Sequence, residues 1–352
     1  MRRVSRIAVA TVATATLAAS LTACGGTSSE AAGGGGGDGK SSKGVALAYD
    51  VGGKGDQSFN DAATAGMEKA AKEFGYGQKA VEPSDGESDA DKVQRLGQLA
   101  KAGYNPVIGV GYAYAPAVKE ASKTFPNVTF GIVDDETVQE KNVADLVFHE
   151  EEASYLAGVT AALTTKSKTV GFIGGVDVPL IHKFEAGFKQ GVADTNPKVK
   201  VLSQFLTEKA EDGGFSSPDK GKTAAQGQIE DGADVVYHAA GLSGQGVIEA
   251  AATAKKWAIG VDSDQYNQDA LKAYKQYILT SALKDVAGAV YNLAKSVQEG
   301  KPATGVVRAS LKTGGVGLAD SNPVFKDNTK LQEALKTATE GIENGTIKVK
   351  TS

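Results

Sequence analysis

From residue 44 onward, short apolar runs alternate with stretches of helical periodicity. Runs of β-branched and apolar residues predict strands at 45–49, 106–110, 128–133, 143–148, 169–173, 199–205, 234–237, 257–261 and 277–281. Apolar residues at i, i+3 and i+4 predict helices at 60–74, 90–102, 116–124, 152–164, 181–194, 217–231 and 246–255. Near-continuous apolar strands separated by helices indicate α/β architecture, with mostly parallel sheets covered on both faces.

This alternation suits either a closed barrel of parallel strands or open, doubly wound sheets. Polar, glycine-rich and aromatic residues gather directly after Tyr49, Val133, Tyr237, Val261 and Ser281. Both architectures bind ligands at the carboxyl ends of their strands, so this clustering does not exclude the barrel. The pattern as a whole favours two open sheets. The length of 352 residues favours two domains over one.

The first 23 residues have the character of a signal peptide. Three arginines precede the apolar segment 7–21, which is shorter than the ~20 residues a spanning helix needs. Leu21-Thr22-Ala23-Cys24 resembles the bacterial lipobox, whose cysteine is lipidated and becomes the first residue after cleavage. The alternative is a plain signal peptide in which Cys24 is incidental. Residues 24–43 are rich in glycine and serine and predict a flexible tether.

Composition narrows the range of functions. The net charge is −4 and no basic block follows the signal peptide, which argues against a nucleic-acid partner. Three histidines and one cysteine cannot build a Cys/His zinc site or a disulfide scaffold. The sequence has no G-x-S-x-G, P-loop or H-E-x-x-H motif, so we expect no metal, no cofactor and no enzymatic activity.

Several predicted strand ends carry candidate ligand-binding residues. Asp50 ends the first strand, and a glycine-rich loop leads from it to Phe59 and Asn60. An aromatic ring in such a loop is suited to stacking on a planar ligand, whereas Asn60 could simply cap the next helix. Asp134 follows the strand 128–133, where its carboxylate could accept ligand N–H groups or cap a helix.

The second half of the chain adds a similar set. Tyr237 ends one predicted strand and His238 and Gly241 follow it, with the glycine allowing close backbone approach to a ligand. Asp262 ends the next strand and Lys284 follows the one after it. A carboxylate and an ammonium at neighbouring strand ends match a vicinal diol, and the alternative is a surface salt bridge of ~0–1 kcal/mol.

Several blocks together resemble the basic membrane protein (BMP) family, the PnrA-like substrate-binding lipoproteins of ABC transporters. The resemblance covers residues 44–350 and rests on Asp56-Gln-Ser-Phe-Asn60, Gly-Ile-Val-Asp134, Phe148-His-Glu-Glu-Glu-Ala-Ser-Tyr-Leu-Ala-Gly158, Gly174-Gly-Val-Asp-Val-Pro-Leu-Ile181, Phe184-Glu-Ala-Gly-Phe188, Pro218-Asp-Lys-Gly-Lys222 and Gly260-Val-Asp-Ser-Asp-Gln265. It implies the type I periplasmic-binding-protein fold, in which three chain segments cross between two α/β lobes. Lobe 1 would comprise 44–150 completed by about 284–315, and lobe 2 would comprise 151–283 completed by about 316–352.

The resemblance also implies roles for the candidate residues. Phe59 would stack on a nucleoside base, and Tyr237, or else His238, would supply a second ring. Asp50, Asn60 and Asp134 would be polar contacts in the pocket. Asp262 and Lys284 would hold the ribose, with Gly241 nearby.

The function implied is a monomeric, lipid-anchored receptor on the extracytoplasmic face of the cell membrane. It would bind a nucleoside, with purines favoured, and deliver it to an ABC permease driven by a separate ATPase. Alternatives are a ligand sensor of the same fold without transport, and an importer receptor for a sugar-like cargo. A secreted nucleoside hydrolase is a further class, but the sequence shows no metal-binding aspartate cluster.

Overall fold

The computed structural model describes residues 42–84 and 86–352. The expected signal peptide, Cys24 and nearly all of the expected tether lie outside the described residues. At the end of that tether, the Ser42 hydroxyl donates to the carbonyl of Asn105 (2.7 Å) and the Lys43 N–H donates to Gly103 (2.9 Å). Ser42 and Lys43 therefore belong to the folded part of the chain.

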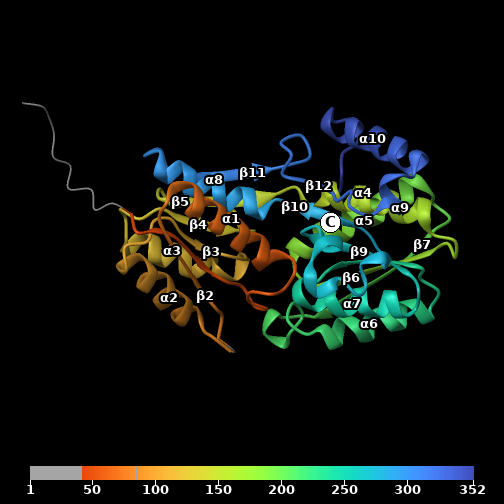
Figure 1. Ribbon diagram of the computed structural model, residues 1–352, viewed down its shortest axis with the longest axis horizontal. Helices are drawn as coiled ribbons and strands as arrows, with labels where there is room; N and C mark the ends of the chain where they lie inside the picture. The colour runs from red at the N-terminus through yellow and green to blue at the C-terminus, as the bar shows by residue number, and fades with distance from the viewer. Residues whose placement is uncertain (1–41, 85) are drawn as a thin grey trace, which may run out of the picture. The chain divides into compact units, whose positions relative to one another are not determined.

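Lobe 1 is built on a six-stranded sheet in the order β11-β5-β4-β3-β1-β2, with all pairs parallel (Figure 1). Val45 and Leu47 pack toward α1 and α8, while Ala46 and Ala48 pack toward α2 and α3, because successive side chains of a strand point to opposite faces. The elements are β1 (Gly44–Ala48), α1 (Phe59–Phe74), β2 (Gly77–Val81), α2 (Asp89–Lys101), β3 (Val107–Gly109), α3 (Ala115–Thr124), β4 (Phe130–Val133), β5 (Val143–Phe148), α8 (Val286–Gln298) and β11 (Gly305–Ala309).

Lobe 2 repeats this plan with the strand order β12-β10-β9-β8-β6-β7, in which only the β10–β12 pair is antiparallel. Helices α4 and α5 cover one face, α6 and α7 cover the other, and α10 packs on α4. The elements are α4 (Glu150–Thr164), β6 (Thr169–Val176), α5 (Pro179–Thr195), β7 (Lys200–Thr207), α6 (Pro218–Glu230), β8 (Val235–Ala239), α7 (Gly244–Thr253), β9 (Trp257–Asp262), β10 (Ile278–Lys284), β12 (Val316–Leu318), α9 (Pro323–Lys326) and α10 (Thr329–Glu343).

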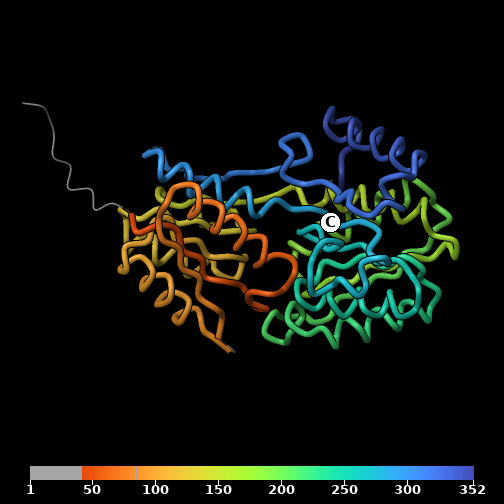
Figure 2. Tube along the Cα trace, in the orientation of Figure 1, coloured from red at the N-terminus to blue at the C-terminus, as the bar shows by residue number. Residues whose placement is uncertain are grey.

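The chain crosses between the lobes three times, from β5 to α4, from β10 to α8 and from β11 to β12 (Figure 2). Hydrogen bonds join these crossings to one another. The His149 N–H donates to Ala309 (2.8 Å), the Leu311 N–H donates to the Glu152 carboxylate (2.8 Å), and the Asp285 N–H donates to Gly315 (2.9 Å). The three segments therefore form one connected hinge.

Two open sheets replace the barrel alternative, and the predicted fold class is confirmed. Six of the helices and strands have no counterpart among the predicted ones: β2, α8, β11, β12, α9 and α10. The residues of β2 are exposed or half-buried, because this strand lies at an edge of its sheet, so they carry no continuous apolar run.

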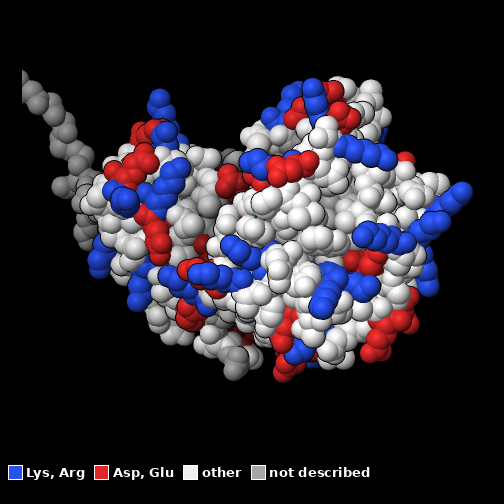
Figure 3. Space-filling model, turned by 45° about the vertical axis from the view of Figure 1, so that its right-hand side comes forward, with Lys and Arg blue, Asp and Glu red and all other residues white. Residues whose placement is uncertain are grey.

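The surface carries charges of both signs. On the face shown in Figure 3, acidic and basic side chains are interspersed over the molecule. Pairs such as Lys189–Glu185 on α5 are partly exposed, and each is worth only ~0–1 kcal/mol. Within residues 42–84 and 86–352, none of the helices combines the length and apolarity needed to cross a membrane.

Candidate ligand-binding site

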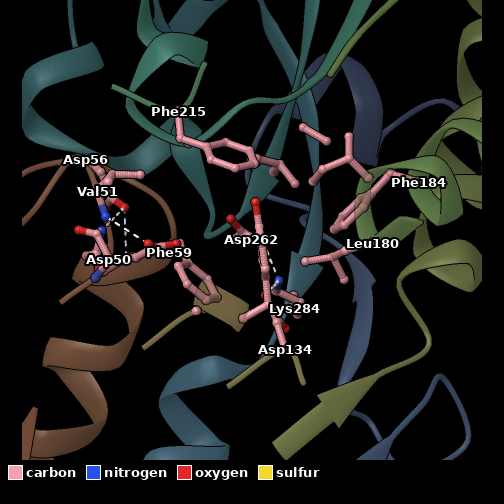
Figure 4. Close-up of a pocket in the computed structure, with 17 residues that line it drawn as sticks. Asp50, Val51, Asp56, Phe59, Asp134, Leu180, Phe184, Phe215, Asp262 and Lys284 are labelled. Atoms are coloured by element: carbon pink, nitrogen blue, oxygen red, sulfur yellow. Dashed lines mark hydrogen bonds and ion pairs between the residues drawn. The ribbon is translucent and has the colours of Figure 1, made fainter. Parts of the chain in front are cut away.

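A cleft lies between the two lobes, at the carboxyl ends of their strands (Figure 4). About 510 Å³ of it is not filled by protein atoms, part of this being continuous with solvent. The lining residues are Asp50, Val51, Asp56, Phe59, Asn60, Gly111, Tyr112, Asp134, Leu180, Ile181, Phe184, Phe215, Ala239, Gly241, Val261, Asp262 and Lys284.

The loop between β1 and α1 is held in shape by Asp56. This buried carboxylate accepts hydrogen bonds from the N–H groups of Ser58 (2.9 Å), Asn60 (2.8 Å) and Asp61 (3.1 Å). It thereby satisfies amides of the first turn of α1 that have no partner within the helix. Burial raises the pKa of Asp56 to about 6. The Ser58 side chain does not cap the helix.

Asn60 serves the same loop. Its side-chain oxygen accepts from the Asp50 N–H (3.0 Å), and its amide nitrogen donates to the Asp56 carboxylate (3.1 Å). Asn60 therefore lines the cleft with polar atoms that are already engaged inside the protein. This arrangement supports a role in positioning the loop.

Besides Tyr112, three phenylalanine rings line the cleft, and they come from different elements. Figure 4 shows Phe59 and Phe184 on opposite sides of Asp262 and Lys284, with Phe215 across the cavity from Lys284. Phe59 begins α1 in lobe 1, Phe184 lies on α5, and Phe215 lies in the loop before α6. Phe215 sits between glycines and serines, which is the signal that singled out Phe59 in the sequence. Neither Phe184 nor Phe215 was among the predicted binding residues.

The expected second ring from β8 does not reach the cleft. The strand was predicted to end at residue 237 but continues to Ala239, so Tyr237 and His238 lie inside the sheet and both are 0% exposed. The Tyr237 ring packs against Phe172 and Phe188, with centroids at 5.5 and 5.2 Å. Of this segment, Ala239 and Gly241 line the cleft instead.

His238 takes part in a buried network of lobe 2. Its Nε2 lies 3.0 Å from Oε1 of Gln265, which also accepts from the Val261 N–H (3.1 Å). Burial lowers the pKa of His238 to about 4, so the ring is neutral at pH 7. The amide nitrogen of Gln265 donates to the carbonyl of Gln57 in lobe 1 (3.1 Å), which links this network to the loop that precedes Phe59.

Asp134, Asp262 and Lys284 meet in the middle of the cleft. The Lys284 ammonium is 2.7 Å from Oδ2 of Asp134 and 3.5 Å from Oδ1 of Asp262, and all three side chains are at most 7% exposed. The ammonium also lies 4.6 Å from the centroid of the Phe59 ring. Both aspartates have left-handed backbones, with φ of 68° and 61°, at the ends of β4 and β9.

Two acceptor atoms of this cluster have no hydrogen-bond partner. They are Oδ1 of Asp134 and Oδ1 of Asp262, whereas Oδ2 of Asp262 accepts from the Ser58 hydroxyl (2.7 Å). Burial alone would lower the pKa of Lys284, but its attraction to Asp134, Asp262 and Glu150 outweighs this and raises it. The lysine is therefore positively charged at pH 7, beside acceptors that are free to bind hydroxyl or N–H groups of a ligand.

Asp50 lies in the lobe 1 wall of the cleft. Its carboxylate accepts from the Val51 N–H (2.9 Å), and Gly111 approaches so closely that a Cβ there would lie 2.4 Å from Oδ2. Burial raises the pKa of Asp50 to about 7. Near neutral pH this carboxyl group is therefore available both as a donor and as an acceptor.

Glu150 is a charged residue that the sequence did not single out. It begins α4 at the first crossing, its side chain is 1% exposed, and its Oε2 has no hydrogen-bond partner, with the Lys183 ammonium 3.8 Å away. Burial, and then repulsion from Asp134, raises the pKa of Glu150. It does not line the cleft, but it adds a further acid behind Lys284.

Comparisons with known proteins agree with this architecture. The profile of the Bmp family, described as "ABC transporter substrate-binding protein PnrA-like", matches residues 43–351. The "CD4+ T-cell-stimulating antigen" of Listeria innocua is 36% identical over 350 residues, covering 94% of each chain. The "ABC transporter nucleoside-binding protein BmpA" of Lactococcus lactis is 33% identical over 325 residues, covering 87% of this chain and 88% of the relative.

Among solved structures, an ABC transporter solute-binding protein from Aeropyrum pernix K1 superimposes with a TM-score of 0.76 at 27% identity. The match covers 88% of this chain and 93% of that one. The fold is thus the type I periplasmic-binding-protein fold. Members of the matched family bind a substrate and work with the membrane components of a transporter. The chain belongs to the Bmp family of PnrA-like ABC transporter substrate-binding proteins.

Proposed function

We propose that this chain is a lipid-anchored receptor on the extracytoplasmic face of the cell membrane, which captures nucleosides, preferably purine nucleosides, for an ABC importer. The observation that carries the proposal is the meeting of three phenylalanine rings with the Asp134–Lys284–Asp262 cluster in one cleft. The nucleoside-binding name of the Lactococcus relative supports the same ligand class.

The rings suit the base of such a ligand. Phe59, Phe184 and Phe215 offer flat apolar surfaces, and each aromatic contact is worth about 0.5–1.5 kcal/mol beyond area burial. A bicyclic purine presents a larger face to these rings than a pyrimidine does. The Asp50 carboxyl, with its raised pKa, would both donate to and accept from the polar edge of a base.

The charged cluster suits the sugar. A vicinal diol has two hydroxyl donors, and Oδ1 of Asp134 and Oδ1 of Asp262 are two buried acceptors without hydrogen-bond partners. Hydrogen bonds to charged groups contribute about 1.5–3 kcal/mol each. A free base lacks the diol and a free sugar lacks the aromatic face, so we expect neither to match the affinity of a nucleoside.

Ligand binding would be coupled to closure of the lobes. A ligand that touches both lobes stabilises the closed form by the difference in its affinity for the two forms. Changing an open-to-closed ratio from 99:1 to 1:99 requires ~5.5 kcal/mol, which two stacking contacts and two charged hydrogen bonds would supply. The function therefore needs binding and movement but no catalysis, and we propose that the chain is not an enzyme.

The membrane anchor would be a lipid on Cys24, and the partners would be a permease and its separate ATPase. Replacement by Cys24→Ser should abolish incorporation of a labelled fatty acid and release the protein from the membrane fraction. Retention of both the label and the membrane association in this variant would contradict the anchor.

The ligand class is tested by thermal unfolding of the full-length chain in detergent, after denaturing purification and refolding to remove bound ligand. Guanosine, inosine and adenosine at 100 times their dissociation constants should each add ~2.7 kcal/mol and raise the melting temperature by several degrees. Free bases and ribose are the matched controls and should produce smaller shifts. A shift with sugars alone would indicate a sugar receptor, and no shift with any compound would favour the sensor without transport.

A further inference from the structure

The cleft has an excess of negative charge. Among the described residues that line it, Lys284 is the single cation, whereas Asp50, Asp56, Asp134 and Asp262 are all acids. The Oδ1 atoms of Asp134 and Asp262, which have no hydrogen-bond partner, belong to side chains that are 4% and 7% exposed. Water screens these charges poorly because they are buried. Asp50, whose pKa is raised to about 7, is only partly ionised at neutral pH. An anion entering the cleft would therefore meet chiefly the carboxylates of Asp56, Asp134 and Asp262 in a medium of low polarity.

Lys284 is not available to offset such an anion. Its ammonium already lies 2.7 Å from Asp134 and 3.5 Å from Asp262. A phosphate could recruit it only by separating it from these buried carboxylates. Leaving a buried charge without its partner is strongly unfavourable.

The backbone amides that commonly bind phosphate are also occupied at this cleft. At the start of α1, the Asp56 carboxylate already accepts from three N–H groups. Helix α5 begins with Pro179, which has no N–H, and the amides of Ile181 and His182 donate to Val178. At the start of α7, the Gly244 N–H donates back into the preceding turn. These helix starts therefore do not form the phosphate site that such termini often provide.

We propose that the charge of the cleft restricts it to uncharged nucleosides and excludes their phosphate esters. This inference rests on the proposed function and adds that the cleft rejects nucleosides that carry a phosphate group. When the source is a nucleotide, a phosphomonoesterase reaction must act before capture: water cleaves the ester, the sugar oxygen leaves as a free hydroxyl, and inorganic phosphate is released. Asp134 and Asp262 are the residues that determine this selectivity.

The test separates charge from size by comparing adenosine-5′-carboxamide with adenosine-5′-carboxylic acid, which are close in size and differ by one charge at pH 7. Isothermal titration of the full-length, refolded chain in detergent should show the acid binding at least about 100-fold more weakly than the amide, as repulsion between close, poorly screened charges requires. Adenosine 5′-monophosphate should bind more weakly still. Asp262→Asn keeps an acceptor for Ser58 and should reduce the ratio between amide and acid by about 10-fold or more, and Asp134→Asn provides a second variant.

The outcomes are distinct. Binding of the acid within about threefold of the amide, in the unmodified protein, would overturn the inference while leaving nucleoside capture intact. Strong discrimination that neither variant reduces would show that Asp134 and Asp262 do not determine it, and would also overturn the inference. If adenosine itself does not bind, the proposed function fails, and this inference fails with it.

Discussion

The Ser58 hydroxyl of lobe 1 donates to Oδ2 of Asp262 in lobe 2 over 2.7 Å, although the two residues are 204 positions apart in the chain. The contact is reinforced in the opposite direction, because the Ser263 hydroxyl donates to the carbonyl of Ser58 (2.8 Å). Both bonds lie beside Phe59 and Asp262, which line the cleft, but Ser58 itself does not line it. They therefore stabilise the approach of the lobes independently of which ligand is bound.

Removing this hydroxyl should weaken binding without changing specificity. Ser58→Ala leaves one oxygen of the buried Asp262 carboxylate without its donor, and hydrogen bonds to charged groups contribute about 1.5–3 kcal/mol. We expect affinity for every nucleoside to fall by a similar factor, of about 10-fold or more, as measured by isothermal titration. Ser88→Ala is the control, because Ser88 caps α2 on the surface and its loss should lower stability by ~1 kcal/mol without changing affinity. A change in the preference among nucleosides would contradict the argument.

Phe215→Ala should reduce nucleoside affinity about 10- to 100-fold, because it removes one face of the aromatic surroundings of the cleft. The matched control is Phe205→Ala in the same lobe. The Phe205 ring packs against Phe172 and His182 and does not line the cleft, so its loss should lower the melting temperature while affinity is retained. Equal losses of affinity in the two variants would argue against a contact between Phe215 and the ligand.

Lys284→Met should both destabilise the protein and abolish binding. The variant leaves Asp134 and Asp262 buried without their cation, a change that typically costs about 3–5 kcal/mol. Urea unfolding measures the stability and titration measures the binding. Lys189→Met removes a partly exposed ion pair with Glu185 and should change stability by at most ~1 kcal/mol. If the two variants have the same stability, the central cluster is not the buried network described above.

Asp50 should make stability depend on pH in a defined direction. Its folded pKa of about 7 lies above the ordinary value of 3.8, so the native state binds a proton more tightly than the unfolded chain does. This difference in pKa stabilises the folded protein by up to about 4 kcal/mol, at 1.36 kcal/mol per pKa unit. The stabilisation is fully present below pH 3.8 and is lost as the pH rises through 7. The side chain at position 50 cannot ionise in Asp50→Asn. The unfolding free energy of this variant minus that of the unmodified protein should therefore increase from pH 4 to pH 8. A constant difference across this range would show that Asp50 ionises freely in the folded protein.

The amino-acid sequence by itself determined the alternation of strands and helices and the polar residues at the strand ends. In a parallel sheet those ends meet at one edge, so the strand pattern groups Asp50, Phe59 and Asp134 at one sheet and Asp262 with Lys284 at the other. The resemblance to the BMP family implied that the two groups share one ligand, and all five residues line the cleft. Gly241 also reaches the cleft, because the turn after β8 passes beside it.

Only the tertiary structure decided which side chains reach the cleft and which enter the core. Tyr237 was expected at the cleft, but two more residues of β8 place it among Phe172 and Phe188, while Phe215 enters the cleft from a loop. The partnership of Ser58 with Asp262 and the burial of Glu150 depend in the same way on the packing of lobes joined by three crossings. The local sequence pattern indicates where strands and turns occur. The exact residue at which β8 ends, and contacts such as that of Ser58 with Asp262, depend on residues far away in the sequence.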